Sequence, residues 1–255
     1  MTRVIKVGGR PQVDPALAGA LASAHWKTPG SLVVVHGGGD EVSSLQRLHG
    51  VVSEFKDGRR ITSLLDLEII RMALSGSANK RLVSALVSEG APALGLSGED
   101  AALLLATPID ADQFGYVGVP ALVNAALLRH LLHGGYLPVL SPVSRCTSAA
   151  EGLTLNVNGD DAAAAIAVAL EAEELLLVSD VPGVLRDGVA MASMSPEDAQ
   201  HLIDNGTARG GMVAKLQAAL RALEGGVERV RISDIAAIGD RERGTMLTRV
   251  GSACT

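Results

Sequence analysis

The stretch from Ser31 to Asp40 reads Ser-Leu-Val-Val-Val-His-Gly-Gly-Gly-Asp. Its apolar part, residues 32–35, is short, β-branched and unalternating, which is typical of a strand covered on both faces. The three glycines that follow permit positive φ and let a ligand approach the backbone, because they have no Cβ. Ligands of open α/β sheets bind beyond the carboxyl ends of strands. The stretch therefore predicts a buried strand that ends in a binding loop; a tight strand-to-helix turn without a ligand is the alternative.

A second strand with a similar ending lies at the start of the chain. Residues 4–7 form a brief apolar strand that contains Lys6 and ends at Gly8-Gly9, and residues 15–24 predict an alanine-rich helix. Strand, helix and strand make a β-α-β unit, so both glycine loops are expected at the same edge of a parallel sheet. Lys6 is then either an edge residue that points to solvent or an ammonium group delivered beside the glycine loops.

The middle of the chain predicts further helices and strands. Residues 55–62 are typical of a polar turn or hairpin, and residues 103–119 of a strand or hairpin excursion. Helices are expected at 63–74 and 79–89, with a break at Ser75-Gly76-Ser77, and at 121–133. Residues 154–161 precede an alanine-rich helix whose N-terminus could hold an anion or order a carboxylate. The alternative there is that Asp160 or Asp161 is a plain N-cap.

The last third of the chain predicts a second lobe. A strand is expected at 175–178 and a helix at 213–223 that carries Lys215. The acidic residues 171–174 read as an exposed connector, so we place the boundary between an N-terminal lobe, 1–171, and a C-terminal lobe, 172–255, at this point. No low-complexity linker separates them. The two lobes are therefore expected to share one continuous sheet in an α/β fold.

Composition limits the classes of function. The chain has 255 residues, a formal net charge of −6, a hydrophobic fraction of 47% and an aromatic fraction of only 2%. An acidic chain of this kind is a poor candidate for a nonspecific nucleic-acid or anionic-membrane surface, and an anionic substrate would need local positive groups. Its two cysteines, Cys146 and Cys254, lie far apart and lack metal-ligand spacing, which fits a reducing cytoplasm. No targeting segment or membrane span is predicted.

Six motifs then occur in order along the chain. They are the lysine-bearing strand that ends at Gly8-Gly9, His-Gly-Gly-Gly from residue 36, Gly-Arg-Arg-Ile-Thr from 58, Asn-Val-Asn-Gly-Asp from 156, Ser-Asp-Val-Pro-Gly-Val from 179 and Gly-Gly-Met-Val-Ala-Lys from 210. In this order and spacing the chain resembles the amino acid kinase family, and most closely those members that phosphorylate N-acetylglutamate. The resemblance covers essentially the whole chain. It implies a three-layer α/β sandwich with a mainly parallel central sheet shared by two lobes.

The resemblance also implies roles for single residues. It makes Lys6 and Lys215 the cations that stabilise the transferring phosphoryl group, and Asp160 the carboxylate that holds both lysines. The residues that it assigns to the acyl-amino-acid acceptor are Gly38, Gly39, Arg60 and Asn156. Those that it assigns to ATP are Gly8, Gly9 and Gly37 along the phosphates, with Asp180, Val181, Pro182, Gly183, Val184, Leu185, Thr207, Ala208 and Arg209.

The implied reaction transfers a phosphoryl group from ATP to the side-chain carboxylate of N-acetyl-L-glutamate, a step of arginine biosynthesis. A carboxylate with an ordinary pKa near 4 is already ionised at pH 7, so no general base is required. The reaction does need in-line positioning and positive charge, which two lysines, glycine N–H groups and Mg²⁺ carried by ATP can supply. The histidines show no metal-ligand spacing, and we expect no metal site built from protein side chains alone.

Two positions depart from the family pattern. Glu99 lies where many members carry lysine, and Tyr116 lies where histidine is common; both put the acyl group or the chain length of the acceptor in doubt. One alternative is therefore a kinase of the same fold that acts on an N-acylated or carrier-protein-linked 2-aminoadipate. A nicotinamide dehydrogenase would want Gly-x-Gly-x-x-Gly after the first strand, where the chain has only Gly8-Gly9. A non-catalytic nucleotide-binding module would be expected to lose a charged catalytic position.

The helices between Ser63 and Glu89 also predict an interface. They are too apolar overall for one whole side to face water, so we expect a homodimer that forms through them.

Overall fold

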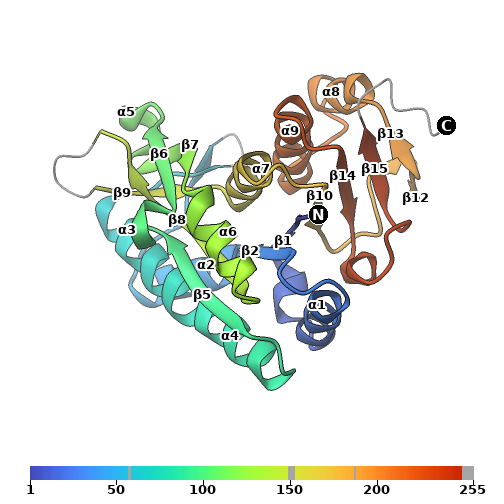
Figure 1. Cartoon of the computed structure of the whole chain (residues 1–255). Helices are drawn as coiled ribbons and strands as arrows, with labels where there is room; N and C mark the ends of the chain where they lie inside the picture. The colour runs from blue at the N-terminus through green and yellow to red at the C-terminus, as the bar shows by residue number, and fades with distance from the viewer. Residues whose placement is uncertain (57–58, 149–152, 187, 249–255) are drawn as a thin grey trace.

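The fold is built on a mostly parallel sheet of eleven strands (Figure 1). The computed structural model describes residues 1–56, 59–148, 153–186 and 188–248. In spatial order the strands are β13 (Ser193–Met194), β15 (Thr245–Thr248), β14 (Arg229–Ser233), β10 (Glu174–Val178), β1 (Arg3–Val7), β2 (Leu32–His36), β8 (Leu137–Cys146), β6 (Leu104–Pro108), β7 (Val117–Val123) and β9 (Thr154–Val157), while β5 (Ala93–Gly98) pairs with β8. Gly58 and Cys254 lie outside the described residues.

Helices cover both faces of this sheet. One face packs against α1 (Ala16–Lys27), α4 (Asn79–Ser88) and the 3₁₀ turn η4 (Ile235–Ile238). The other packs against α6 (Ala125–His133), α7 (Gly159–Ala169), α8 (Pro196–Asp204) and α9 (Gly211–Glu224). The remaining elements are α2 (Gly39–Leu48), α3 (Leu64–Ile70), the π-helix η2 (Arg71–Ala78), α5 (Ala111–Phe114), the 3₁₀ turns η1 (Arg10–Val13) and η3 (Asp100–Ala102), and the hairpins β3 (Phe55–Lys56) with β4 (Arg59–Arg60) and β11 (Leu185–Arg186) with β12 (Val189–Ala190).

The alternation of side chains along the central strands sorts the core into two layers. Val4 belongs to the core cluster that contains residues of α7 and α9, whereas Ile5 belongs to the cluster that contains residues of α1 and α4. Because successive side chains of a strand point to opposite faces, Lys6 lies on the α7 and α9 side with Val4. By the same rule His36, at the end of β2, shares the α1 and α4 side with Val34. The three-layer α/β sandwich with a mainly parallel sheet, which the family resemblance implied, is confirmed.

The expected helix break at Ser75-Gly76-Ser77 is wrong. The chain passes from α3 through the π-helix η2 into α4 without leaving the helical region. A π-helix keeps backbone hydrogen bonds while it admits a wider turn, so weak helix formers in its middle do not have to end it. The helix expected from residue 121 begins only at Ala125, because residues 121–123 extend β7 and Asn124 caps the helix.

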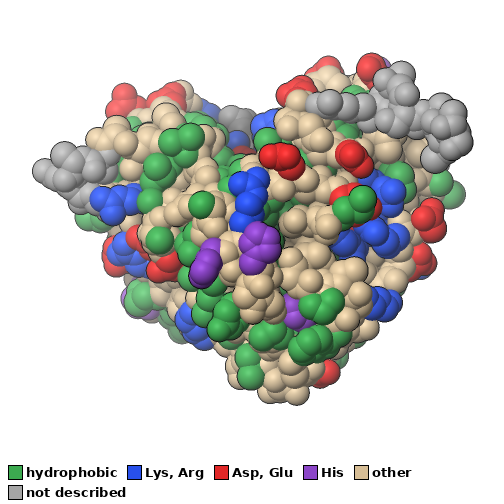
Figure 2. Space-filling model, viewed as in Figure 1, with side chains coloured by type: hydrophobic (Ala, Val, Ile, Leu, Met, Phe, Trp, Pro, Cys, Tyr) green, Lys and Arg blue, Asp and Glu red, His purple; other side chains and the backbone are tan. Residues whose placement is uncertain are grey.

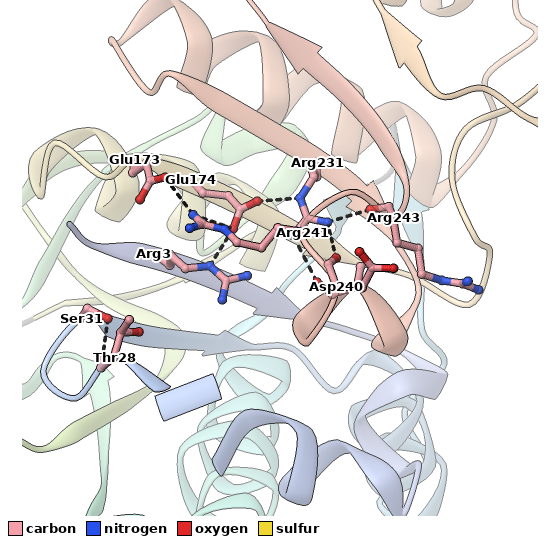
Figure 3. A network of polar contacts seen from close by, with 10 residues as sticks. Arg3, Thr28, Ser31, Glu173, Glu174, Arg231, Asp240, Arg241 and Arg243 are labelled. Atoms are coloured by element: carbon pink, nitrogen blue, oxygen red, sulfur yellow. Dashed lines mark hydrogen bonds and ion pairs between the residues drawn. The ribbon is translucent and has the colours of Figure 1, made fainter. Parts of the chain in front are cut away.

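The prediction of an exposed acidic connector at residues 171–174 is also wrong, because its last residue, Glu174, is part of a buried strand. Glu174 is fully buried in β10, where one carboxylate oxygen accepts from Arg3 Nε at 2.6 Å and the other from Arg231 Nε at 2.5 Å (Figure 3). Arg231 is fully buried as well, and it donates to the carbonyls of Ala237, Asp240 and Arg243. A buried charge needs a partner, and the sequence pattern alone did not show that two arginines from β1 and β14 supply it.

The two halves of the sheet are continuous. β10, beyond the predicted boundary, pairs in parallel with β1 along five residues from Arg3 to Val7. A notch divides the surface between the half that carries β5 to β9 and the half that carries α8 and α9 (Figure 2). The assignment of 1–171 and 172–255 as lobes stays a prediction. In the part of the chain that the structure describes, no helix is both long and apolar enough to cross a membrane.

Candidate active site

Two lysines from distant parts of the chain meet at one buried carboxylate. Lys6 Nζ lies 2.9 Å from Asp160 Oδ1, and Lys215 Nζ lies 3.4 Å from Asp160 Oδ2. Lys6 is on the central strand β1, Asp160 is in the first turn of α7, and Lys215 is in the second turn of α9. All three side chains are buried, so Lys6 is not an edge residue that points to solvent. The structure brings together the three residues predicted to be catalytic.

The electrostatics of this cluster favour an anionic ligand. Burial raises the pKa of Asp160, but attraction to Lys6 and Lys215 outweighs it, so the pKa lies below its ordinary value. Burial lowers the pKa of Lys215, and repulsion from Lys6 lowers it further, against the attraction of Asp160. With one carboxylate between two ammonium groups, the cluster keeps a net positive charge in a buried position. A phosphoryl group placed beside it would reduce that repulsion.

Two cavities meet at the cluster. Cavity A has a volume of about 780 Å³ and is lined by residues that include Gly37, Gly38, Gly39, Arg60 and Asn156. Cavity B has a volume of about 1150 Å³ and is lined by residues that include Asp180, Val181, Arg209, Gly211 and Lys215. Lys6, Gly8, Gly9, Asn158 and Asp160 line both. The cluster therefore lies where a ligand in one cavity would face a ligand in the other.

The N-termini of three helices lie at these cavities. Helices α2, α7 and α9 begin at Gly39, Gly159 and Gly211, and each of these glycines lines at least one cavity. The residues before α2 and α9 are glycines that give no side-chain cap. Uncapped helix N-termini carry unpaired N–H groups and a partial positive charge, which favours bound phosphate or carboxylate.

Glycine at position 8 is required by the lysine cluster itself. A Cβ on Gly8 would overlap Lys6 Nζ, so any larger residue would displace the ammonium group from its place. This is the close approach that the Gly8-Gly9 motif suggested, although the group that approaches is a side chain of the same strand.

Arg60 is held at the wall of cavity A by neutral partners. It donates to Gln46 Oε1, to Ser53 Oγ at 2.6 Å, to Ser43 Oγ at 2.9 Å and to the Gly39 carbonyl at 3.2 Å, and it stacks on the Phe55 ring. Among the described residues no carboxylate forms an ion pair with it. A fixed guanidinium without a direct counter-ion can bind a carboxylate of a ligand.

Asn156 lies across the same cavity. Its Nδ2 donates to Thr62 Oγ1 at 3.1 Å, which leaves the amide oxygen for other donors. Cavity A therefore gathers all four residues predicted to bind the acceptor: Gly38, Gly39, Arg60 and Asn156.

The predicted nucleotide residues divide into two groups. Gly8, Gly9, Asp180, Val181 and Arg209 line cavity B, and Gly37 lines cavity A. The other six line neither cavity; they are Pro182, Gly183, Val184, Leu185, Thr207 and Ala208. Val184 and Ala208 contribute to the hydrophobic core, and the Pro182 carbonyl accepts from Ser233 Oγ.

Asn158 is a site residue that sequence reasoning missed. It is the N-cap of α7, and its Oδ1 accepts from the backbone N–H of Asp160 at 2.8 Å. Neither Asp160 nor Asp161 caps the helix, so both carboxylates can make other contacts. Asp160 forms ion pairs with the two lysines, and Asp161 forms ion pairs with Arg59 and Arg221. The Asn-x-Asp spacing was the available signal, because asparagine is among the preferred N-caps.

Glu99 and Tyr116, the two departures from the family pattern, are both held by hydrogen bonds. The Glu99 carboxylate accepts two hydrogen bonds from Arg71, one from Nε at 3.0 Å and one from Nη2. It accepts a third from Thr154 Oγ1 at 2.6 Å. Burial raises the pKa of Glu99, but the hydrogen bonds from Arg71 and Thr154 bring it below its ordinary value. Tyr116 contributes its backbone, with its N–H donating to the Thr62 carbonyl at 2.8 Å and its carbonyl accepting from Asn156 N–H at 2.9 Å. Neither side chain lines cavity A.

Comparison with known proteins agrees with this geometry. The sequence model of the amino acid kinase family matches residues 1–234. This chain belongs to the amino acid kinase family. The chain of this amino acid kinase is 44% identical over 239 residues to the acetylglutamate kinase of Chloroflexus aurantiacus, which covers 93% of both proteins. It is 43% identical over 233 residues to that of Geobacillus stearothermophilus, over 91% of this chain and 89% of that protein.

Solved structures give the same fold. A crystal structure of a Streptococcus mutans UA159 protein superposes with a TM-score of 0.87 at 30% identity, over 97% of this amino acid kinase and 98% of that chain. A carbamate kinase from Giardia lamblia bound to AMP-PNP superposes with a TM-score of 0.73 at 15% identity, a level at which only the fold is comparable.

Proposed function

We propose that this chain is an acetylglutamate kinase, which transfers the terminal phosphoryl group of ATP to the side-chain carboxylate of N-acetyl-L-glutamate. The product is N-acetylglutamyl 5-phosphate, and the reaction is a step of arginine biosynthesis. The observation that carries the proposal is the convergence of Lys6 and Lys215 on Asp160 where cavities A and B meet. Relatives named acetylglutamate kinase, at 40–44% identity, support the choice of acceptor.

In this reaction the acceptor occupies cavity A. Arg60 is placed to bind the α-carboxylate, because its guanidinium is fixed and has no direct carboxylate partner among the described residues. Asn156 has an amide oxygen available for the N–H of the acylated amino group. Binding at both points would aim the side-chain carboxylate at the lysine cluster, and the rate gain from such positioning is large.

ATP occupies cavity B, with its phosphates toward Gly8 and Gly9 and the N-terminus of α9. Mg²⁺ bound to the phosphates would supply additional positive charge. Lys6 and Lys215 meet the negative charge of the transferring group, and Asp160 fixes both ammonium groups without being consumed. The attacking carboxylate is already ionised, so the site needs no base.

The organisation of the molecule follows from the same assignment. We propose that residues 1–171 bind the acceptor and form the dimer, and that residues 172–255 bind most of the nucleotide. The exposed apolar residues of α3, η2 and α4, which are Leu64, Leu65, Met72 and Val87, support a homodimer through this face. A cytoplasmic location is supported by the free thiol of Cys146 and by the biosynthetic role.

The test is ADP release from ATP with four acceptors compared side by side: N-acetylglutamate, N-succinylglutamate, N-acetyl-2-aminoadipate and free glutamate. We expect the highest kcat/KM with N-acetylglutamate, and little turnover of free glutamate, which lacks the acyl group. Preferred turnover of the aminoadipate derivative would replace the proposed acceptor with the longer one. No ADP release with any acceptor, from a protein that binds ATP, would contradict catalysis.

A further inference from the structure

His36 is a buried group that the proposed reaction does not use. It ends β2, is fully buried, and directly precedes Gly37, Gly38 and Gly39, which line cavity A. Its ring points to the α4 side of the sheet, where Nε2 lies 3.0 Å from Asn79 Nδ2 and Nδ1 lies 2.9 Å from the Gly37 carbonyl oxygen. The ring therefore connects the first residue of α4 with the glycine loop of the site.

The orientation of the Asn79 amide is fixed by its other contacts. Its Nδ2 lies 2.9 Å from the Val139 carbonyl and 3.4 Å from the Leu96 carbonyl, and both can only accept hydrogen bonds. Its Oδ1 lies 3.1 Å from Lys80 Nζ, which can only donate. Nδ2 is therefore a donor to His36 Nε2, and Nε2 must carry a lone pair. In a neutral ring the hydrogen then resides on Nδ1, and Nδ1–H donates to the Gly37 carbonyl.

The Gln12 side-chain amide is compatible with this tautomer when it is rotated by about 180°, which exchanges its Oε1 and Nε2 atoms. Its Nε2 lies 3.2 Å from His36 Nδ1, whereas its Oε1 is buried without a hydrogen-bond partner among the described residues. Exchanging the two amide atoms brings the oxygen to the Nδ1–H group, and side-chain amides adopt whichever orientation the network favours. Burial lowers the pKa of His36 to about 4, against a smaller opposing effect of the Gly37 carbonyl, so the ring is neutral at pH 7.

The hydrogen bond to Gly37 orients the peptide that follows. In a trans peptide the carbonyl and the next N–H point in opposite directions, so a carbonyl held toward His36 directs the Gly38 N–H away from the ring. In the described chain this N–H makes no hydrogen bond, and Gly38 has a φ of 148°, which favours glycine. The conformation leaves an unpaired donor beside cavity A.

We propose that His36 is a positioning residue, held by Asn79 as the neutral Nδ1–H tautomer, which fixes the Gly37–Gly38 peptide so that Gly38 N–H donates to an oxygen of the transferring phosphoryl group. The phosphoryl contact rests on the proposed function. Asn79 reaches the ring because it is the first residue after the π-helix η2, and such segments occur often at functional sites. A Cβ at position 95 would overlap Asn79 Oδ1, so Gly95 leaves the room that this arrangement needs.

The tautomer is tested in the unmodified enzyme by NMR of protein labelled with ¹⁵N-histidine, with the His36 signals assigned by their loss in the His36→Asn protein. We expect a one-bond N–H coupling at Nδ1 and none at Nε2 at pH 7. A proton on Nε2, with or without one on Nδ1, would overturn the proposal. This measurement requires no activity, so it stands even if the proposed function fails.

The positioning role is tested by steady-state kinetics with ATP and N-acetylglutamate. The His36→Leu side chain has similar bulk and no donor, whereas the amide nitrogen in His36→Asn can take the place of Nδ1–H. We expect His36→Leu to lower kcat by roughly 10- to 100-fold with both KM values changed less than about threefold, as for loss of a transition-state contact. We expect His36→Asn to recover to within about fivefold of the wild-type kcat.

The matched control is His25→Leu. His25 is as fully buried as His36 but lies near the end of α1, away from both cavities. Its substitution should lower the melting temperature and leave kcat unchanged. Wild-type kcat in a folded His36→Leu protein, or equal kcat in the Leu and Asn variants, would contradict the positioning role. If His36→Leu does not fold, the NMR measurement on the wild-type enzyme decides the matter. Absence of turnover in the wild type would instead contradict the proposed function.

Discussion

At the scale of single residues, the proposed mechanism assigns the chemistry to the two lysines. We predict that Lys6→Ala and Lys215→Ala each lower kcat by about 10² to 10³-fold while they change the KM of the acceptor much less, since their charge matters most as the phosphoryl group transfers. Initial rates at varied ATP and N-acetylglutamate measure both parameters. Lys27→Ala, an exposed lysine at the end of α1, is the control. Unchanged kcat in either cluster variant would remove that lysine from the mechanism.

We assign Arg60 to acceptor binding rather than to chemistry. Its guanidinium lies on the wall of cavity A among neutral acceptors, so we predict that Arg60→Ala raises the KM of N-acetylglutamate at least about tenfold, the value of a charged hydrogen bond. The affinity for ATP, measured by calorimetry, should stay within about twofold. Arg47→Ala, an exposed arginine that donates to Ser44 on the same helix, serves as the comparison. Weaker ATP binding with normal acceptor binding would reverse the assignment of the two cavities.

At the scale of elements, Glu174 ties three neighbouring strands together. It lies on β10 and pairs with Arg3 of β1 and Arg231 of β14 (Figure 3). We predict that Glu174→Gln lowers the free energy of unfolding by about 3 to 5 kcal/mol, because it leaves Arg231 buried without its counter-ion. Urea denaturation measures the loss. Glu228→Gln, at an exposed position before β14, should change the free energy of unfolding by less than about 0.5 kcal/mol.

The same carboxylate gives a pH dependence. Burial raises the pKa of Glu174, but the hydrogen bond and charge of Arg231, together with Arg3, lower it below the ordinary value of 4.5. A depressed folded pKa means that the stabilisation is complete above the unfolded pKa and is lost as pH falls through the folded pKa. We therefore predict that the stability difference between wild type and Glu174→Gln is constant near pH 7 and shrinks below about pH 4.5. A difference that grows as the pH falls would refute this account.

At the scale of the whole molecule, the exposed apolar residues of α3 and η2 predict self-association. Leu65 and Met72 are 54% and 50% exposed, and they lie on the helices that the sequence marked as too apolar to face water. We predict a dimer by light scattering at micromolar concentration, and a monomer after combined Leu65→Glu and Met72→Glu substitution. Val189→Glu, an exposed apolar position on the β11–β12 hairpin, should leave the dimer intact. A wild-type monomer at every concentration would exclude the interface.

Local preferences along the chain were enough to predict several of the strands and loops and their order. The unalternating run at 32–35 and the glycines after it were sufficient to predict a buried strand with a loop at its carboxyl end, because β-branched residues and glycine have strong local preferences. Local reasoning failed at Glu174, which it placed in an exposed connector, and at Ser75-Gly76-Ser77, where it expected a break. In both cases partners distant in sequence, or a wider helical turn, satisfied groups that look unfavourable in isolation.

The meeting of distant side chains depends on how the layers pack. Lys6, Asp160 and Lys215 are separated by up to 209 positions of sequence numbering, and the family resemblance alone had placed them together. Their meeting depends on strand parity: Lys6 shares the face of Val4, and that face packs against α7 and α9, which carry the other two. The same parity sends His36 to the opposite face, toward Asn79. A local pattern cannot specify such pairs. It indicates the face of the sheet on which a side chain lies, but the residue that it contacts there is set only when the layers pack.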